Sequence, residues 1–560
     1  MFAYQAVLEC VVAHVRASFL RQVRKEGHPA HGAFLSDWYA GGYPSADHCG
    51  NESDLVKACQ VYLAPGSPLE DDAELLARIR DSIAFQRRWQ RPTGLIDLTC
   101  LNTESPPDTG FVVQGCAAVV TVARMKPANS GASHIAQELG EFVRTAAQGM
   151  IGRGFHTPNH RWVVCGALAR AMALFPDLPA KEYLESILAE GIDIQADGEY
   201  TERSMGVYNA VCNYAIRNMA DSLGRPELLK AVRANLDFMT HMFHDDGSIV
   251  TSISNRQDRG RRVVPLSAAE TFFDLAQREG NGVWAAVADS LFDHRQESTS
   301  ATMLEPFLLH PEYQHDSLKR STLPDHFTRY YPVSGVWRVK RGRLSATAAT
   351  NSRTAFAVYY GQVHLKSVKI AGSCHGTSHV CNNTMEQISN GVRLVNRGSM
   401  NGFAGYYLPL GKPVPFGEFH RMERERKTWL LPELNQTVDM VEVENGFDLH
   451  LQSDGGLDRV PMEIECAFNG PGEWETTDTL MRVENGFSVI LKTGHGTFRC
   501  GDEGITIGPG SGVHCDWEMR ESHPTKDAFR VLITFQTPFK RTLEIRYGKW
   551  SLATRKLIGV

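Results

Sequence analysis

Two short segments of this chain carry side chains that could remove a proton from a carbon atom beside a carboxylate. Residues 159–162 read Asn-His-Arg-Trp, and residues 197–209 begin with Asp-Gly-Glu-Tyr and end with Tyr-Asn. An amide, an imidazole and a guanidinium can hydrogen-bond a carboxylate and stabilise the negative charge that develops beside it. A phenol can act as a base or as an acid. This set of residues predicts the cleavage of a uronic-acid glycan by elimination.

Each step of such an elimination has a candidate residue. We predict that Asn159 and His160 hold the carboxylate of the sugar, because this stabilises the enolate-like charge that forms when the neighbouring proton leaves. Tyr208 is the predicted base, with cations such as Arg203 or Arg256 stabilising its phenolate. When the proton and the leaving oxygen lie on one face of the sugar, Tyr208 is also the predicted acid.

Further residues are candidates for binding the rest of the sugar chain. Four arginines lie within residues 256–262, and such a loop suits the recognition of sulfate or carboxylate groups. Aromatic side chains such as Trp162 and Tyr407 are predicted to stack on sugar rings. The predicted substrate-binding residues are Gln114, Arg161, Trp162, Arg203, Arg256 and Tyr407.

Other roles for the same residues stay open. Asn159 could cap a helix after Pro158, and a single His or Tyr in a helix is more often packed than catalytic. The carboxylates of residues 193–202, Glu202 among them, could instead supply the two acids of a glycoside hydrolase that acts on uronic-acid oligosaccharides. A non-catalytic glycan-binding protein is the third alternative.

The elements that must position these residues are helices over residues 1–320. Apolar residues recur there at helical intervals, and Pro and Gly residues interrupt the pattern. A long succession of helices has to close on itself or stack to bury its apolar faces, and a toroid of antiparallel helix pairs is one such closure. The predicted helices span residues 2–25, 70–89, 112–126, 132–150, 160–175, 180–191, 204–222, 226–243 and 266–292.

Residues 321–560 have the sequence pattern of β-structure. Short β-rich stretches alternate with turns, and the Asn-Gly dipeptides at 390–391, 445–446 and 485–486 are typical of hairpins. Many short strands at such spacing indicate an antiparallel β-sandwich. The predicted strands include residues 345–350, 355–360, 392–395, 447–451 and 487–491. The predicted fold class is therefore a multidomain chain, α and then β, with the boundary between residues 306 and 343.

Composition and charge limit the classes of molecule that the chain is expected to bind. The chain has 560 residues, of which 42% are hydrophobic and 22% are charged, as in ordinary globular proteins. Its net charge of −6 argues against nucleic acid as a partner. The same charge is compatible with an anionic uronate glycan, because a basic cleft can lie on an acidic protein.

The first residues and the cysteines give a prediction of where in the cell the protein is located. The short apolar run at the start of the chain has no basic leader and is interrupted by Glu9, so no signal peptide is evident. No stretch reaches the length of a membrane span. The twelve cysteines are scattered along the chain, which favours reduced thiols and a cytoplasmic protein. The sequence makes no prediction of the oligomeric state.

Together these features resemble the heparinase II/III-like polysaccharide lyase superfamily, which includes glycosaminoglycan and alginate lyases. Its members have an incomplete (α/α) toroid followed by an antiparallel β-sandwich. The pair Asn159-His160 looks like the Asn-His of these lyases, near the start of an inner helix. Residues 197–209 are similar to the family's Asp-Gly-x-x-x-Glu-x-Ser-x-x-Tyr-His, with one extra residue before Tyr208 and Asn209 in place of the final His. The resemblance implies a lyase that produces unsaturated uronides.

The resemblance also points to a histidine of the β-domain. Residues 375–379, His-Gly-Thr-Ser-His, look like the sandwich segment that contributes a histidine to the cleft, which makes His379 a catalytic candidate. For the opposite sugar epimer, His160 or His379 is expected to take the proton while Tyr208 serves as the acid. Some relatives hold a zinc ion in the sandwich, but Asn382 and Asn383 stand here in place of a metal-binding Asp. We therefore predict no metal ligand, and keep a zinc site at residues 374–379 as the alternative.

Overall fold

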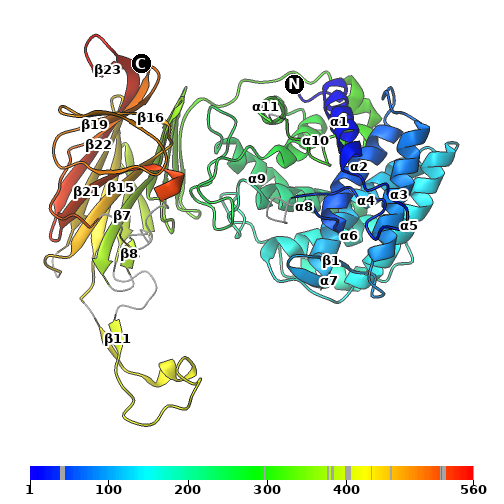
Figure 1. Ribbon diagram of the computed structural model, residues 1–560, viewed down its shortest axis with the longest axis horizontal. Coiled ribbons are helices and arrows are strands. Elements are labelled where there is room, and N and C mark those ends of the chain that lie inside the picture. The colour runs from blue at the N-terminus through cyan, green and yellow to red at the C-terminus, as the bar shows by residue number, and fades with distance from the viewer. Residues whose placement is uncertain are drawn as a thin grey trace.

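The computed structural model describes residues 1–37, 44–295, 297–374, 377–379, 384–397, 405–430, 432–454, 457–516, 519 and 525–558, with the backbone alone for residues 374, 377–379 and 525. Figure 1 shows two lobes side by side, one helical and one built of β-sheets, with the N-terminus on the first and the C-terminus on the second. The predicted order of a helical region followed by a mostly antiparallel β region is confirmed. The predicted boundary at residue 320 falls in the segment between the last helical turn and the first strand of the large sheets.

The helical lobe contains a short hairpin, β1 (Ile96–Leu98) and β2 (Asn102–Ser105), between its third and fourth helices. None of the helices in the described part of the chain is both long and apolar enough to cross a membrane. The helices are α1 (Tyr4–Ser18), α2 (His48–Leu63), α3 (Ala73–Trp89), α4 (Pro106–Arg124), α5 (Ser130–Met150), α6 (Pro158–Leu174), α7 (Lys181–Leu188), α8 (Tyr208–Leu223), α9 (Leu229–Thr240), α10 (Ala269–Glu279), α11 (Gly282–Asp293) and α12 (Glu305–Leu309).

The even-numbered helices form an inner row. α2 packs on α4, α4 on α6, α6 on α8, and α8 on α10. Each of them also packs on the odd-numbered helix that follows it in the chain. This is the alternation of inner and outer helices that an (α/α) toroid requires. Because an inner helix has neighbours on most sides, its polar residues are buried and must find partners inside the lobe.

Two of the differences from the predicted helices have a clear local cause. α2 is not predicted, because its polar residues hide its apolar periodicity; as an inner helix it buries Asn51, Asp54, Lys57 and Gln60. The predicted helix over residues 266–292 is in fact divided into α10 and α11. Gly280 ends α10 with a φ of 68°, a conformation that glycine adopts without strain. The side chain of Asn281 then accepts hydrogen bonds from the first N–H groups of α11 and caps it.

The β lobe consists of two large sheets whose inner faces share one apolar core. In one sheet the strand order is β18-β21-β15-β7-β6-β5-β4-β3, and in the other it is β17-β16-β19-β20-β22-β14-β13-β10-β9. Short β8 and β23 pair with β7 and β22. Neighbouring strands are antiparallel except for β18 and β21.

The strands of the first sheet are β3 (His326–Tyr331), β4 (Val336–Arg341), β5 (Leu344–Ala349), β6 (Phe356–Tyr360), β7 (Val363–Cys374), β8 (Thr377–His379), β15 (Pro461–Phe468), β18 (Ser488–Ile490) and β21 (Phe529–Gln536). Those of the second are β9 (Thr384–Ile388), β10 (Gly391–Asn396), β13 (Gln436–Val443), β14 (Gly446–Ser453), β16 (Gly472–Glu475), β17 (Leu480–Val483), β19 (Gly496–Cys500), β20 (Glu503–Gly508), β22 (Lys540–Ser551) and β23 (Lys556–Ile558). Two of the predicted Asn-Gly turns connect paired strands, β9 with β10 and β13 with β14. The third, at residues 485–486, instead leads from one sheet to the other.

Direct polar contacts join the two lobes. In the segment before α8, Asp197 accepts hydrogen bonds from the Ser334 hydroxyl at 2.6 Å and from the Ser334 N–H at 2.9 Å. Arg338 of β4 is fully buried and donates to two backbone carbonyls just after α9. The Ser352 hydroxyl, between β5 and β6, donates to the Ser252 carbonyl at 2.7 Å. The β lobe thus supports the loop that carries Arg256 and the segment that leads to Tyr208.

A projecting segment leaves the β lobe between β10 and β13. It contains the antiparallel pair β11 (Gly405–Tyr407) and β12 (Thr428–Leu430), which belongs to neither large sheet. Figure 1 shows it extending beyond the sheets and clear of the helical lobe. We call residues 405–430 the β11–β12 arm.

Candidate active site

The candidate catalytic residues of the helical lobe lie at the start of two adjacent inner helices. Asn159 and His160 are in the first turn of α6, Tyr208 is the first residue of α8, and the two helices pack against each other. Pro158 starts α6, because proline is favoured in the first turn, where its missing N–H costs nothing. Helix N-termini carry partial positive charge and free N–H groups. This end of the lobe is therefore suited to binding an anion.

Glu202 connects the two helix ends. Its carboxylate accepts hydrogen bonds from the Asn159 side-chain amide at 2.7 and 2.9 Å and from the Asn159 backbone N–H at 2.9 Å. The same carboxylate forms an ion pair with Arg256. The carboxylate that Asn159 holds in this structure therefore belongs to the protein itself. A direct hydrogen bond from Asn159 to the substrate stays a prediction.

Tyr208 is half-buried, and its hydroxyl has one protein partner among the described residues. The Gln257 side-chain amide donates a hydrogen bond to Tyr208 Oη at 2.8 Å. The guanidinium of Arg256 lies over the Tyr208 ring, 4.7 Å from its centroid. A donor N–H and a guanidinium both stabilise the negative charge of a phenolate. The surroundings of Tyr208 therefore suit a phenol that has to act as a base.

Asp258 holds the Tyr208 segment against the loop that carries Arg256 and Gln257. Its carboxylate accepts hydrogen bonds from the Ser204 hydroxyl at 3.0 Å, the Gly206 N–H at 2.9 Å and the Ser254 hydroxyl at 2.9 Å. Ser204 in turn accepts from the Tyr208 N–H at 3.3 Å. Because these bonds fix Ser204 ahead of the helix, α8 begins at Tyr208 and not at residue 204 as predicted. The side chain of Tyr208 consequently lies at the end of the helix and not along its face.

His160 is a neutral imidazole packed among rings. Its ring makes edge contacts with His156, at 4.5 Å between centroids, and with Phe111, at 6.2 Å. Burial, followed by the neighbouring His156, lowers the pKa of His160 to about 4, and Arg256 adds to this shift while Asp108 opposes it. Its buried Nδ1 has no hydrogen-bond partner in the described part of the chain. His160 is therefore unprotonated at neutral pH.

The guanidinium of Arg203 has N–H groups that are not used in hydrogen bonds to the described residues. Its Nε and Nη2 atoms are buried and have no hydrogen-bond partner among the residues that the structure describes. Burial lowers its pKa, and Glu199 and Asp197 only partly offset this effect. Its backbone adopts a φ of 49°, an unusual conformation that surrounding structure must enforce, and its carbonyl accepts from the Asn255 N–H at 2.8 Å. These features are compatible with the predicted role in binding an anionic group.

The structure corrects three of the predicted substrate-binding residues. Trp162 is 0% exposed and its indole N–H donates to Asp193 at 2.7 Å, so its ring cannot stack on a sugar. Arg161 pairs with the same Asp193 at 3.1 Å and lies over the Trp162 ring. Gln114 is 2% exposed and accepts from the Asn218 amide at 3.1 Å inside the lobe. Trp162 and Gln114 face the interior because they lie on inner helices with neighbours on most sides, whereas Arg161 is partly exposed and is held by Asp193 and Glu190.

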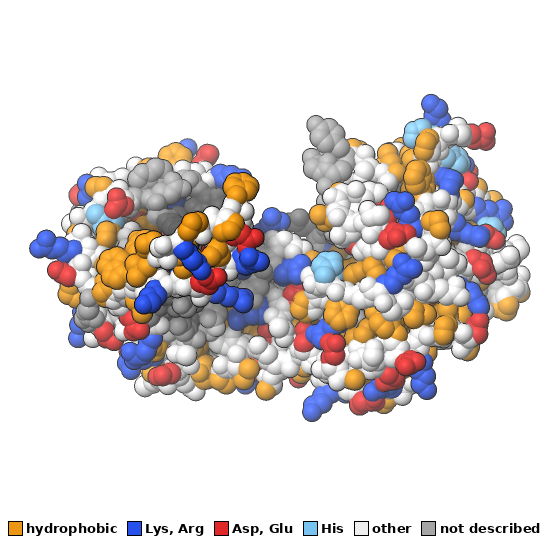
Figure 2. Space-filling view, turned by 90° about the horizontal axis from the view of Figure 1, so that it is seen from below, with side chains coloured by type: hydrophobic (Ala, Val, Ile, Leu, Met, Phe, Trp, Pro, Cys, Tyr) orange, Lys and Arg blue, Asp and Glu red, His pale blue; other side chains and the backbone are white. Residues whose placement is uncertain are grey.

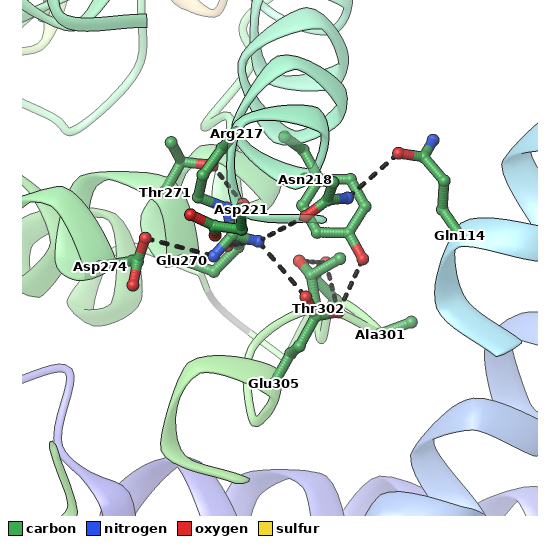
Figure 3. Close-up of polar contacts among 12 residues, drawn as sticks. Gln114, Arg217, Asn218, Asp221, Glu270, Thr271, Asp274, Ala301, Thr302 and Glu305 are labelled. Carbon is green, nitrogen blue, oxygen red and sulfur yellow. Dashed lines mark hydrogen bonds and ion pairs between the residues drawn. The ribbon is translucent and has the colours of Figure 1, made fainter. Parts of the chain in front are cut away.

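Gln114 belongs to a second polar cluster, which we call the Arg217 network (Figure 3). Arg217 lies on α8 and pairs with Glu270 at 3.1 Å, Asp274 at 3.4 Å and Glu305 at 3.3 Å. The hydroxyl of Tyr214 donates to Glu305 at 2.6 Å. Burial raises the pKa of Glu270 to about 7, although Arg217 opposes this shift. The members of the network are Gln114, Arg170, Tyr214, Arg217, Asn218, Asp221, Glu270, Asp274, Arg278 and Glu305.

Two predicted residues belong to the β lobe. Tyr407 lies on the β11–β12 arm, partly exposed, with its hydroxyl 3.4 Å from a Glu423 oxygen. The backbone of His379 pairs with Ala371 at the end of β8, but its side chain lies outside the described part of the chain, as do those of the alternative zinc ligands. Among the described residues, no group of three or more His, Cys, Asp or Glu side chains is arranged to hold a metal ion.

The structure adds residues that the sequence interpretation did not single out. His156 packs against His160, Gln257 binds the Tyr208 hydroxyl, and Asp258 orders the Tyr208 segment. His156 precedes α6, so the rule that pairs residues four positions apart on a helix does not predict its contact with His160. Gln257 and Asp258 come from a loop distant in sequence, so no local pattern places them beside Tyr208.

Comparison with solved structures supports the same fold. Heparinase III has a TM-score of 0.55 at 10% identity, with 97% of this chain and 85% of heparinase III aligned. The chondroitin AC lyase of Streptomyces coelicolor A3, solved with chondroitin sulphate, has a TM-score of 0.52 at 12% identity, covering 99% of this chain and 80% of the lyase. A Paenibacillus xanthan lyase has a TM-score of 0.53 at 11% identity, covering 98% of this chain and 57% of the lyase.

These likenesses establish the fold, because nearly the whole chain aligns while few residues are identical. The predicted resemblance to heparinase II/III-like lyases is therefore confirmed at the level of architecture, a helical region followed by a mostly antiparallel β region. No protein-family model matches the sequence. No curated protein matches it either.

Proposed function

We propose that this chain is a lyase that cleaves uronate-containing glycans by β-elimination, with Tyr208 as the base. The arrangement around Tyr208 carries the proposal: its hydroxyl accepts a hydrogen bond from Gln257, and its ring lies under Arg256. His160, a neutral imidazole, lies at the start of the adjacent helix. The lyase fold supports the same reaction class, because heparinase III and chondroitin AC lyase share it.

In the proposed reaction the phenolate of Tyr208 takes the proton from C5 of the uronate. The electrons of that C–H bond form a C4=C5 double bond, and the bond from C4 to the glycosidic oxygen breaks. Tyr208, now protonated, returns its proton to that oxygen when both groups lie on one face of the sugar. For the opposite epimer, His160 takes the C5 proton and Tyr208 donates its own, and His379 stays the alternative base.

The carboxylate of the sugar needs a partner, because its interaction with donors stabilises the charge that forms at C5. Asn159 and Arg256 are both engaged with Glu202. Arg203 has two buried N–H groups without a partner, and the starts of α6 and α8 are favourable to an anion. We therefore assign the carboxylate to Arg203 and the two helix starts, with Asn159 and Glu202 holding Arg256 over Tyr208.

The geometry gives less support to a glycoside hydrolase. Glu199 is 0% exposed, and burial raises its pKa to about 8. Glu202 is 6% exposed and is already bound to Asn159 and Arg256. Neither carboxylate is placed to face a sugar, as the two acids of a hydrolase must be.

The proposal is tested by mixing the protein with heparan sulfate, chondroitin sulfate, hyaluronan, alginate and glucuronan in separate reactions. A lyase produces a C4=C5 double bond, so ultraviolet absorbance should rise with at least one of these polymers. New reducing ends without absorbance would replace the lyase by a hydrolase. In that case Glu202→Gln should abolish activity while Tyr208→Phe retains it. Binding without either signal would leave a glycan-binding protein.

A further inference from the structure

The β11–β12 arm exposes an unusual concentration of large apolar side chains. Tyr406 is 50% exposed and Trp429 is 59% exposed. Figure 2, which looks toward the side from which the arm projects, shows hydrophobic and basic side chains close together on the β lobe. The exposed apolar residues of the arm are Tyr406, Tyr407, Leu408, Phe416, Phe419, Trp429 and Leu430. Such a surface is seldom left exposed without a ligand or partner.

Tyr406 and Trp429 place two aromatic rings on one face of the hairpin. They are directly opposite each other in the antiparallel pair of β11 and β12, so their side chains point to the same face. Their ring centroids are 6.0 Å apart and their planes differ by 24°. Two nearly parallel rings on one face match the apolar faces of consecutive sugar rings, which pack on aromatic side chains through their C–H groups.

The charges beside these rings favour an anionic ligand. Residues 405–430 contain five Lys and Arg but only three Glu, in a chain whose net charge is −6. Each Glu has a basic partner within the arm: Glu425 pairs with Lys412 at 2.8 Å, Glu423 with His420 at 2.7 Å, and Glu418 with Arg421. The charges of the arm are therefore not balanced internally.

Three of the five Lys and Arg residues lie close together in the sequence of the arm. Arg424, Arg426 and Lys427 have no carboxylate partner among the described residues, and they directly precede Thr428 and Trp429. Arg426 lies over the Phe419 ring, 4.8 Å from its centroid. Guanidinium and ammonium groups bind carboxylate and sulfate through charge-assisted hydrogen bonds. A uronate glycan combines both requirements, since each sugar offers an apolar face and an anionic group.

We propose that the β11–β12 arm is a second binding site for anionic glycan chains, outside the active site. The choice of a uronate glycan rests on the proposed function. A second copy of this chain, paired arm to arm, is a poorer fit, because a two-fold contact uses the same surface of both copies and would bring the cations Arg424, Arg426 and Lys427 of the two arms together. A chain held at the arm and at the active site together gains affinity from the high local concentration of its second segment.

The test measures binding in the Tyr208→Phe background, in which the glycan is not cleaved. Affinities are measured for a long uronate chain and for a tetrasaccharide of the same polymer. Replacing both Tyr406 and Trp429 by Ala is expected to weaken binding of the long chain about tenfold or more and to leave the tetrasaccharide unchanged. The charge-reversed variant Arg424→Glu, Lys427→Glu should weaken the long chain in the same way and reduce the salt dependence of binding.

Two controls separate the arm from general effects. Phe487→Ala removes an exposed aromatic ring of the β lobe outside the arm and should leave both affinities unchanged. Trp429→Tyr keeps a flat ring, so near-normal affinity would show that the loss in the Ala variant is not caused by unfolding of the hairpin.

An unchanged affinity for the long chain in both arm variants would overturn the proposal. A wild-type dimer that dissociates on Trp429→Ala, measured by sedimentation, would also overturn it in favour of self-association. The proposed function fails separately: if the wild type binds long chains through the arm but forms no double bond, the arm site stands and the lyase does not. If the wild type cleaves the glycan but the arm variants bind the long chain as tightly as the wild type does, the lyase stands and the arm site does not.

Discussion

The two polar clusters on α8 differ in how far their charged groups are already paired. In the Arg217 network each arginine has at least one carboxylate partner, and Arg217 has three. In the cluster around Tyr208, Arg256 pairs with Glu202, whereas Arg203 has no carboxylate partner among the described residues, and Tyr208 itself is partly exposed. The centres of the two clusters are nine residues apart, about 14 Å along the helix. One helix therefore supplies a closed cluster that holds the lobe together and an open one that can bind and react.

The comparison predicts that the largest effect on stability comes from the closed cluster. Arg217→Met should lower the free energy of unfolding by about 3–5 kcal/mol, because it leaves three buried carboxylates without their shared cation. Arg203→Met should cost less than about 1 kcal/mol, because Arg203 has no ion-pair partner to lose. Denaturant unfolding measures the change in the free energy of unfolding of each variant. Equal losses in the two variants would contradict the distinction between the clusters.

A smaller effect, on activity, is expected at His160. His160→Gln should lower the rate of elimination about 10–100-fold, because the imidazole acts on the proton or the carboxylate of the substrate. Since the pKa of His160 is lowered to about 4, the wild type should retain this contribution down to about pH 5. The pH dependence of the rate measures this. Loss of wild-type activity near pH 6.5, removed by His160→Gln, would show that His160 is not the neutral group described.

The smallest effect is a change in how stability depends on pH. Glu270 has a pKa of about 7 in the fold against an ordinary value of 4.5, so the folded state retains a proton that the unfolded chain has lost. Stability should therefore fall as the pH rises from about 4.5 to about 7 and then level off. In Glu270→Gln the decrease in the free energy of unfolding over this pH range should be smaller by on the order of 1 kcal/mol. Thermal unfolding from pH 5 to pH 8 measures it, and an unchanged slope would argue against the buried, partly protonated carboxyl.

Much of the fold is predictable from the sequence, because the apolar periodicity changes from helical to alternating near residue 320. The two main exceptions have different local causes. α2 escapes notice because an inner helix buries Asp54 and Lys57, which a surface helix would expose. The break at Gly280 is a matter of one capping residue, too local for a periodic pattern to reveal.

The site is only partly predictable, because inner helices bury polar residues that are not part of the site. Tyr208, His160 and Asn159 are brought together as expected from their positions ahead of two helices. Gln114 and Trp162, by contrast, are polar or aromatic residues of inner helices that face other helices. A sequence pattern does not tell a residue of a buried network from a residue of a cleft, because both interrupt apolar periodicity in the same way.

One matched pair of variants on α8 tests the central claim most directly. Tyr208→Phe and Tyr214→Phe each remove one hydroxyl, the first from the open cluster and the second from its hydrogen bond to Glu305 in the closed one. With a uronate glycan that the wild type cleaves, Tyr208→Phe should lower the initial rate of ultraviolet absorbance increase about a thousandfold, within the range of general acid–base catalysis. Its unfolding midpoint should stay unchanged. Tyr214→Phe should keep most of the rate and lose about 1–3 kcal/mol of stability. Full activity of Tyr208→Phe would contradict the account.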